Sequence, residues 1–327
     1  MIEFKYLLEK IGDAEFSDAP FPHIQVGAFF STEHFAEIIA ASEIALPVCG
    51  DDRSLLSALL DNGYRILDFP GCFNKPEDYI AWHRTGHDAA SRDVIEGEFG
   101  LVLRLVKPLT PTISRLKAFL ESELFVASLA AKFSIAPKDC VYDCGIQKYL
   151  DGYQISPHPD IRRKALTYMI NINPFPASEQ LSHHTQYLRF KSEFAYISAY
   201  WSGNPAVERA HLPWFVAEPV WTHTHNNSAV IFAPSNESLH AVRASYDHLS
   251  GQRTQLYGNL WYRKPTVLPT ANWSQLAISA RLPPEHGLAG FRHKVSGLLP
   301  PAVKSLLRSK RSSSETGLHY RKTVDRA

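Results

Sequence analysis

Apolar side chains recur at helical spacing in two stretches within the first 140 residues. Residues 31–46 carry phenylalanine, isoleucine and leucine near this spacing, behind a Ser-Thr start that could cap a helix. Residues 110–132 repeat the pattern, with Pro111 in the first turn, where proline is tolerated, and a break expected near Glu121. We therefore expect both stretches to form helices that pack against a sheet.

From residue 141 onward the sequence pattern changes to short runs rich in β-branched and aromatic residues. Turn-forming residues separate these runs, which cover residues 145–150, 165–171, 187–190, 229–232, 241–244 and 255–262. Helices first and strands later favour an α+β fold rather than alternating βαβ units. The pattern predicts an antiparallel jelly roll or barrel with an N-terminal helical buttress.

The chain length predicts one enlarged domain. A chain of 327 residues exceeds the usual domain size, but not by enough to require two cores. We expect a single domain over residues 1–310, with mainly helical support over 1–140, a jelly-roll core over 141–265 and a C-terminal extension over 266–310. Residues 311–327 are basic and rich in serine, which predicts a flexible tail.

Charge and cysteine content narrow the class of protein. The formal net charge of +1 provides no argument for a nucleic acid or a membrane as partner, and the oligomeric state stays open. No basic segment followed by an apolar core opens the chain, and its four cysteines have no compact disulfide spacing, so we expect a cytoplasmic protein. Cys140 and Cys144 with Asp143 do not match a zinc knuckle, which favours structural thiols.

Two histidines and one aspartate form the main candidate for a metal site. His158 and Asp160 are two residues apart, so on a strand both would point to one face, unless Asp160 lies just past the strand end. His240 follows the apolar run 228–234 and opens another strand-like segment. Two imidazoles and one carboxylate suit Fe(II) and leave coordination positions open, although zinc could bind the same trio.

A candidate anion site follows the third of these residues. Arg253 begins an extended run, and its planar guanidinium suits the far carboxylate of a keto-diacid. Thr254 or Gln255 could add a hydrogen bond, and the Tyr149 hydroxyl could reach the same carboxylate. Arg243, three residues after the last histidine, should face away from the metal.

At this point the chain resembles the Fe(II)- and 2-oxoglutarate-dependent oxygenase superfamily, in its prolyl-hydroxylase-like branch. The motifs that carry the resemblance are residues 147–149, 158–160, 164–171 and 240–253. It covers residues 141–264, and residues 19–26 resemble the lead-in of such enzymes. Pro159 between the first two ligands and residues 186–190 in place of a glycine-rich hairpin depart from the pattern, which bears on the substrate-facing wall.

The resemblance implies a double-stranded β-helix (jelly-roll, cupin-like) core and a dioxygenase reaction. Fe(II) would be held by His158, Asp160 and His240, and the co-substrate 2-oxoglutarate by Arg253, Tyr149 and Thr254. With O2 as second co-substrate, an unactivated C–H bond of a small molecule would be hydroxylated, giving succinate and CO2. The substrate would be an amino acid, sugar, nucleoside or natural-product intermediate.

Two other functions stay open at this point. One is hydroxylation of a peptide or protein side chain, and the other is a non-catalytic cupin-like module that binds metal without turnover. The aspartate ligand argues against a halogenase.

Residues 190–227 form a long insertion between the ligands, rich in tyrosine and tryptophan. It is either a substrate cover or a segment whose aromatics attach it to the barrel. His183, His184, His223 and His225 are expected to be ordinary polar or surface residues, one of which could line the substrate pocket.

Overall fold

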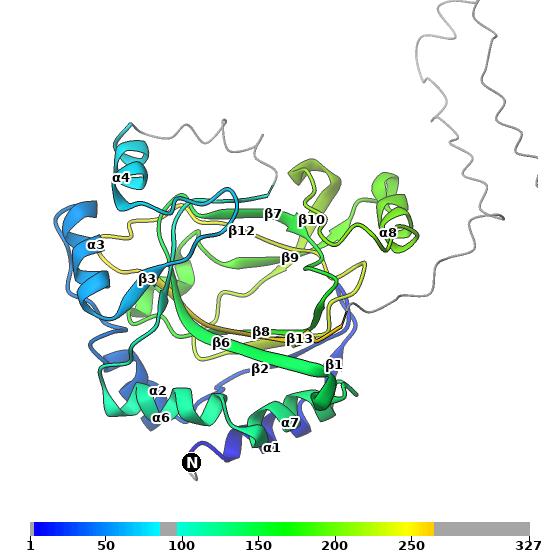
Figure 1. Cartoon of the computed structure of the whole chain (residues 1–327), viewed down its shortest axis with the longest axis horizontal. Coiled ribbons are helices and arrows are strands. Elements are labelled where there is room, and N and C mark those ends of the chain that lie inside the picture. The colour runs from blue at the N-terminus through cyan, green and yellow to red at the C-terminus, as the bar shows by residue number, and fades with distance from the viewer. Residues whose placement is uncertain (1–2, 86–96, 265–327) are drawn as a thin grey trace, which may run out of the picture. The chain divides into compact units, whose positions relative to one another are not determined.

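The strands of the computed structural model, which describes residues 3–85 and 97–264, form two antiparallel sheets that face each other (Figure 1). The larger sheet has the order β1-β2-β11-β8-β13-β6-β5-β3, and the smaller one β10-β9-β12-β7-β4. The larger sheet contains β1 (Phe16–Ser17), β2 (His23–Val26), β3 (Tyr64–Ile66), β5 (Val102–Leu105), β6 (Cys140–Tyr149), β8 (Lys164–Asn171), β11 (Ala229–Phe232) and β13 (Arg253–Tyr262). The smaller sheet contains β4 (Glu98–Phe99), β7 (Gln154–His158), β9 (Thr185–Phe190), β10 (Ala217–Thr222) and β12 (His240–Arg243).

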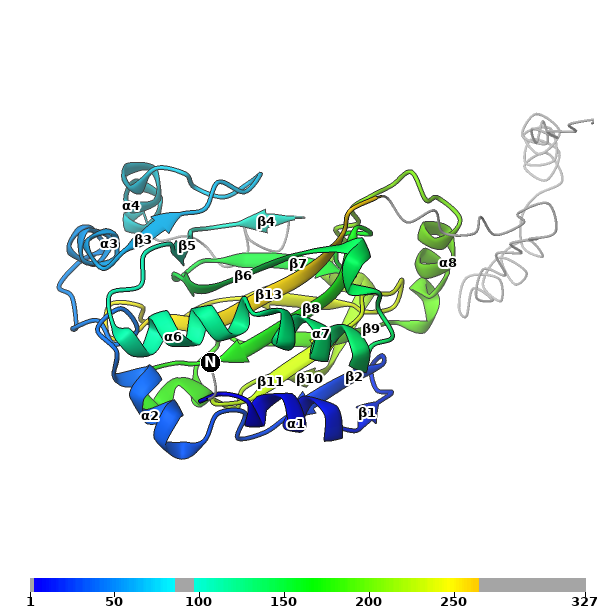
Figure 2. The same cartoon turned by 60° about the horizontal axis from the view of Figure 1, so that its bottom comes forward.

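Helices cover the outer face and one end of the larger sheet (Figures 1 and 2). The α-helices are α1 (Tyr6–Asp13), α2 (Thr32–Ala40), α3 (Asp52–Asp61), α4 (Pro76–Arg84), α6 (Pro111–Leu120), α7 (Glu123–Lys132) and α8 (Tyr196–Ser202). Four short 3₁₀ helices, among the described residues, span Pro137–Asp139, Pro176–Gln180, Ser192–Phe194 and Trp214–Val216.

The helices predicted from the sequence are confirmed, with shorter bounds. In α2 the Ser31 hydroxyl caps the first turn by accepting a hydrogen bond from the backbone N–H of His34 at 3.2 Å. The predicted break near Glu121 separates α6 from α7, and Ser122 caps α7. A new N-cap is the physical reason for the break, because its side chain replaces a helical hydrogen bond.

The six predicted strands are also confirmed, and the structure adds others. The region before residue 140 contributes β1, β2, β3 and β5 to the larger sheet and β4 to the smaller one, in addition to its helical support. All regular structure described here belongs to one compact unit. The predicted extension over 266–310 and the tail over 311–327 lie outside the described residues.

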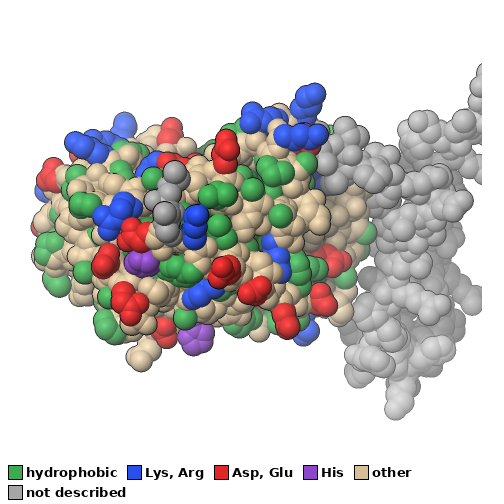
Figure 3. All heavy atoms as spheres, turned by 90° about the horizontal axis from the view of Figure 1, so that it is seen from below, with side chains coloured by type: hydrophobic (Ala, Val, Ile, Leu, Met, Phe, Trp, Pro, Cys, Tyr) green, Lys and Arg blue, Asp and Glu red, His purple; other side chains and the backbone are tan. Residues whose placement is uncertain are grey.

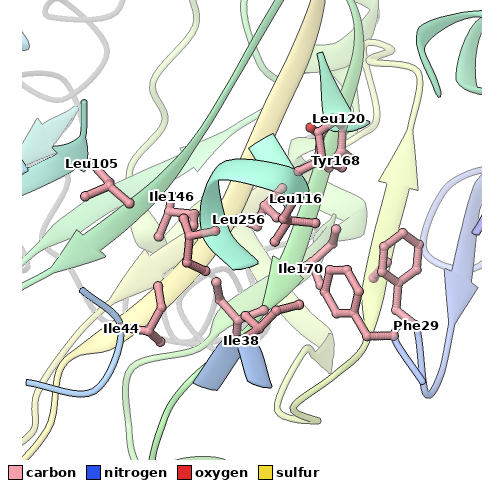
Figure 4. Packing of buried hydrophobic residues seen from close by; sticks show 14 of the residues in the cluster. Phe29, Ile38, Ile44, Leu105, Leu116, Leu120, Ile146, Tyr168, Ile170 and Leu256 are labelled. Carbon is pink, nitrogen blue, oxygen red and sulfur yellow. The ribbon is translucent and has the colours of Figure 1, made fainter. Parts of the chain in front are cut away.

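The hydrophobic core lies between the helices and the outer face of the larger sheet (Figure 4). Ile38 from α2 and Leu116 from α6 pack with Ile146 of β6 and Leu256 of β13, and each is at least 93% buried. Because side chains alternate along a strand, Leu256 faces the helices while its neighbours Arg253 and Gln255 line the space between the sheets. The inner face of the larger sheet is therefore available for polar chemistry.

The insertion at 190–227 is partly a structural element rather than one long cover. Its β10 pairs with β9, which extends the smaller sheet. Trp201 stacks on the Arg162 guanidinium at 4.0 Å, and Trp221 stacks on the Tyr187 ring. These contacts favour the second interpretation, in which the aromatics attach the insertion to the barrel.

Charges of both signs are interspersed over the helical face of the molecule (Figure 3). In the described part of the chain, no helix combines the length and apolarity needed to cross a membrane.

Candidate metal centre and its cavity

The three predicted metal ligands lie together, buried between the sheets. His158 ends β7 and His240 begins β12, and the two residues are direct partners in the antiparallel register. Asp160 lies two residues past the strand end, with its carboxylate oxygens 3.9 Å from the Nε2 atom of each histidine. All ligand atoms lie within 4.8 Å of one another, a spacing that could hold a metal ion.

Backbone carbonyls set the orientation of both imidazoles. The Nδ1 atom of His158 lies 2.9 Å from the Ser156 carbonyl oxygen, and that of His240 lies 3.0 Å from the Ser238 carbonyl oxygen. A carbonyl only accepts hydrogen bonds, so each Nδ1 carries the hydrogen and each Nε2 presents a lone pair toward Asp160. This arrangement is typical of metal-binding histidines.

The protonation states also suit a metal. Burial lowers the pKa of His240, and burial together with the neighbouring His240 lowers the pKa of His158 well below its usual value. Both imidazoles are therefore neutral at pH 7, which is the form that ligates metals.

Asp160 is held in its charged form. Burial alone would raise its pKa, but the Lys164 ammonium is the main group that outweighs burial and keeps the pKa well below the usual range. The Lys164 ammonium donates to one carboxylate oxygen at 2.5 Å, and the Thr167 hydroxyl donates to the other at 2.7 Å. The φ angle of Asp160 is +74°, a left-handed conformation that is uncommon outside glycine and often found at functional sites.

The triad opens into a cavity of about 290 Å³ between the sheets. Side chains from both sheets line it. From β13 it is lined by Arg253, Gln255, Tyr257, Asn259 and Trp261.

Arg253 is 1% exposed and lines this cavity, as the anion-site prediction requires. Its Nη2 donates to the Thr185 hydroxyl at 3.0 Å, and its guanidinium lies 4.4 Å from the centre of the Tyr149 ring. Among the described residues, its Nε and Nη1 groups have no hydrogen-bond partner. A buried cation with unpaired donors is costly, which indicates that a ligand completes the site.

Of the four histidines expected to be ordinary polar or surface residues, three are buried near Arg253, so they are not surface residues: His183, His184 and His223. Burial, with Arg253 as the next cause, lowers the pKa of His184 to about 4. Burial also lowers the pKa of His223 to about 3, with smaller effects from His184 and Arg253. His183 is fully buried, whereas His225 is exposed as predicted. Neutral histidines leave the Arg253 charge uncompensated.

Of the other predicted co-substrate residues, Tyr149 lines the cavity and Thr254 does not. The Tyr149 hydroxyl is hydrogen bonded to the Gln147 side-chain amide, so its ring, rather than its hydroxyl, faces Arg253. Thr254 points to the opposite face of β13, where its hydroxyl accepts a hydrogen bond from the buried Lys148 ammonium at 2.8 Å. Strand alternation therefore removes Thr254 from the site.

Arg243 lies outside the cavity, as predicted. Its guanidinium is 4.2 Å from the centre of the Trp214 ring, and it is not among the cavity-lining residues. Cys140 and Cys144, both on β6, belong to no metal-binding group within residues 3–85 and 97–264.

A second group with metal-ligand spacing consists of Asp52, His83 and His248. The backbone N–H of Asp151 donates to His248 Nδ1 at 3.0 Å, so the hydrogen of that ring lies on Nε2, 2.7 Å from Asp52. The His83 nitrogens contact Asp52 at 2.8 Å and Asp151 at 3.2 Å. A ring nitrogen that carries hydrogen cannot ligate a metal, so we interpret this group as a hydrogen-bonded ion cluster.

Sequence reasoning missed the residues that support the ligands. Lys164 and Thr167 contact Asp160, and Thr185 contacts Arg253. Lys164 and Thr167 lie in the motif 164–171, but their contact with Asp160 was not predicted, and Thr185 is 68 residues from its partner. Only the four-residue spacing of Lys164 from Asp160 offered a signal.

Comparison with known proteins gives structural likenesses alone, since no protein family model and no curated protein matches the chain. A prolyl-4-hydroxylase from Pseudomonas putida shares 11% identity over 80% of this chain and 99% of its own, with a TM-score of 0.34. An oxidoreductase of the 2OG-Fe(II) oxygenase family from Burkholderia pseudomallei shares 13% identity over 68% of this chain and 95% of its own, with a TM-score of 0.27. SnoN, a non-heme alpha-ketoglutarate-dependent epimerase from nogalamycin biosynthesis, shares 12% identity over 86% of this chain and 93% of its own, with a TM-score of 0.35.

Because every TM-score lies well below 0.5, we infer the function from the geometry of the site.

Proposed function

We propose that this protein is an Fe(II)- and 2-oxoglutarate-dependent dioxygenase that hydroxylates an unactivated C–H bond of a small molecule. One observation carries the proposal: a buried His-Asp-His triad and a buried arginine with unpaired donors line the same cavity. The first suits a metal with open coordination positions, and the second suits a carboxylate. A keto-diacid can bind at both places, with its keto acid end at the metal and its far carboxylate at the arginine.

The triad fits Fe(II) by its donor set. His158 and His240 would supply neutral Nε2 atoms, and Asp160 an anionic oxygen whose charge Lys164 and Thr167 stabilise. When bound, iron and 2-oxoglutarate supply the oxidising power for the C–H bond, with O2 consumed and succinate and CO2 released.

The chain itself positions the co-substrate. Arg253 leaves its Nε and Nη1 donors unpaired, and Thr185 takes only one of the two Nη2 hydrogens. The second Nη2 hydrogen forms a planar fork with one of these unpaired donors, and such a fork matches a carboxylate in bidentate geometry. Thr185 and the Tyr149 ring fix the orientation of the guanidinium, so little conformational entropy is lost when the carboxylate binds. Burial excludes water from this charge pair and strengthens it.

The order of the strands supports a double-stranded β-helix core. From β6 to β13, β6, β8, β11 and β13 lie in the larger sheet, and β7, β9, β10 and β12 lie in the smaller one. A jelly roll consists of eight antiparallel strands in two facing sheets, and this distribution of strands is consistent with one. This arrangement brings β7 beside β12 and so brings the two histidine ligands together.

The size of the cavity favours a small molecule over a protein side chain. A volume of about 290 Å³ lies at the lower end of the range of small-molecule sites, and residues of both sheets line it.

Anaerobic titration of the iron-loaded protein with 2-oxoglutarate tests the proposal. We expect the visible charge-transfer band of an iron-chelated keto acid in the wild type, and its loss in Asp160→Ala. Absence of this band in wild-type protein that has bound iron would contradict the proposal and favour a non-catalytic metal-binding module.

A further inference from the structure

Glu98 is a carboxylate of the metal-site cavity that the proposed reaction does not use. It lies on β4, where it pairs with Ile155 of β7, three residues before the ligand His158. Glu98, Ile155 and His158 all line the same cavity. The substrate would therefore meet this carboxylate as it approaches the metal.

The Glu98 carboxylate is incompletely paired. One oxygen accepts a hydrogen bond from the Tyr153 hydroxyl at 2.8 Å. Among the described residues, the other oxygen has no hydrogen-bond donor, and no basic side chain forms an ion pair with Glu98 within 4.0 Å. Gly100 allows the backbone next to Glu98 to approach Tyr153 closely. Any other residue at this position, with its φ of +101°, would place a Cβ atom 2.6 Å from the Tyr153 Cα.

The nearby cations are engaged elsewhere or lie at the surface. Lys164 donates to Asp160 and to the Tyr257 hydroxyl. Arg104 forms a bidentate pair with Asp143, at 2.9 and 3.2 Å. Arg209 lines the cavity from the insertion, but it is an exposed residue.

Enclosing a carboxylate without a directly paired cation is costly, and burial raises the pKa of Glu98 although the Tyr153 hydrogen bond and the more distant charges of Lys164 and Arg209 lower it. A bound cation would remove this cost. Aromatic rings of Phe69, Tyr153 and Trp261 line the same cavity, and such rings attract ammonium and guanidinium groups through their faces.

We propose that Glu98 is a specificity-determining residue that binds a primary ammonium or guanidinium group, so that the substrate is a small cationic amine. Basic amino acids, amino sugars and polyamines belong to this class. The inference rests on the proposed function for what happens to the substrate, but the binding of a cation can be measured separately.

Paired probes that differ by one positive charge test the inference. We would compare L-arginine with L-citrulline, L-lysine with L-norleucine, and D-glucosamine with D-glucose, by calorimetry on the full chain with Fe(II) and 2-oxoglutarate without oxygen. In at least one pair the member with the extra positive charge should bind about tenfold tighter than its partner, because one strong charge-assisted hydrogen bond contributes a difference of this size. Glu98→Gln, which keeps an acceptor for Tyr153, should abolish this preference.

Asp143→Asn is the matched control, because it removes a carboxylate of the same cavity that Arg104 already neutralises. It should keep the preference for the cation. Equal binding of both members in every pair, or a preference that survives in Glu98→Gln, would overturn the inference. If the Glu98 variant does not fold, the binding of the paired probes to the wild-type protein tests the inference by itself.

The visible band of the 2-oxoglutarate complex separates the two proposals. A band without a cation preference overturns the role of Glu98 and leaves the oxygenase proposal intact. A cation preference without the band supports Glu98 and contradicts the oxygenase proposal.

Discussion

At the scale of single residues, the metal centre depends on side chains that do not touch the metal. The Asp160 carboxylate faces the metal position and also accepts hydrogen bonds from the Lys164 ammonium and the Thr167 hydroxyl. The imidazoles are oriented by backbone carbonyls, which substitution of side chains does not remove. The supporting groups of the carboxylate are therefore the part of the centre that mutation can test.

Thr167→Val should weaken Fe(II) binding by about tenfold to a hundredfold, because it removes a hydrogen bond to the ligand carboxylate at nearly constant volume. Calorimetric titration with Fe(II) under nitrogen measures this affinity. Thr167→Ser keeps the hydroxyl and is the control. Unchanged affinity in the valine variant would show that the hydrogen bond does not support the ligand.

Arg253→Lys should raise the KM for 2-oxoglutarate by about tenfold or more, because the charge remains but the bidentate fork is lost. Fe(II) affinity should not change. Steady-state kinetics of 2-oxoglutarate consumption provide the measurement, with Arg243→Lys, outside the cavity, as the control. An equal KM in the wild type and Arg253→Lys would exclude Arg253 as the carboxylate anchor.

At the scale of elements, the cluster of Asp52, His83, Asp151 and His248 joins four segments. Asp52 begins α3, His83 lies in α4, Asp151 follows β6, and His248 precedes β13. The cluster thus fastens the two helices to loops next to the strands that carry Tyr149 and Arg253. Its stabilising effect depends on the charge of His83.

The stability from this cluster should fall as pH rises above about 6.5, the ordinary histidine value. The hydrogen bond to Asp151, opposed by burial and reinforced by Asp52, raises the pKa of His83. A raised folded-state pKa means that the stabilisation is complete below the unfolded value and is lost as pH rises through the folded value. Urea unfolding at several pH values measures this loss, which should be absent in His83→Gln. The same pH dependence in both proteins would contradict the role of His83.

At the scale of the whole molecule, the two faces of the larger sheet have separate tasks. The outer face packs against the helices in one hydrophobic core, and the inner face carries the polar cavity. Substitutions in the helical layer should therefore change stability without changing the chemistry of the site.

Leu116→Ala should lower the free energy of unfolding by about 2–5 kcal/mol, because it leaves a cavity beneath the sheet. The charge-transfer band with 2-oxoglutarate should remain at temperatures where the variant is folded. Leu124→Ala is the control, since Leu124 is 52% exposed. A folded Leu116→Ala variant without the band would show that the helical layer also shapes the site.

The sequence by itself determined the features that depend on local order. Strand alternation and cap residues are local, so the two predicted helices, the six strands and the places of His240 and Arg253 at strand starts could be predicted. The strand β7 that carries His158 was not among the predicted strands. The two-residue spacing of His158 and Asp160 also indicated a ligand pair, but Asp160 reaches the site from beyond the end of β7, with a φ of +74°, rather than from the same strand face.

Only the tertiary structure decided which groups surround these residues. Thr185 reaches Arg253 across 68 residues, and Tyr153, which directly precedes β7, reaches Glu98 across 55, because these segments lie together only in the folded molecule. Thr254, predicted as a co-substrate ligand, points away because its neighbour Arg253 takes the inner face. Contacts between distant segments, and the burial that shifts pKa values, arise from packing and leave no local pattern in the chain.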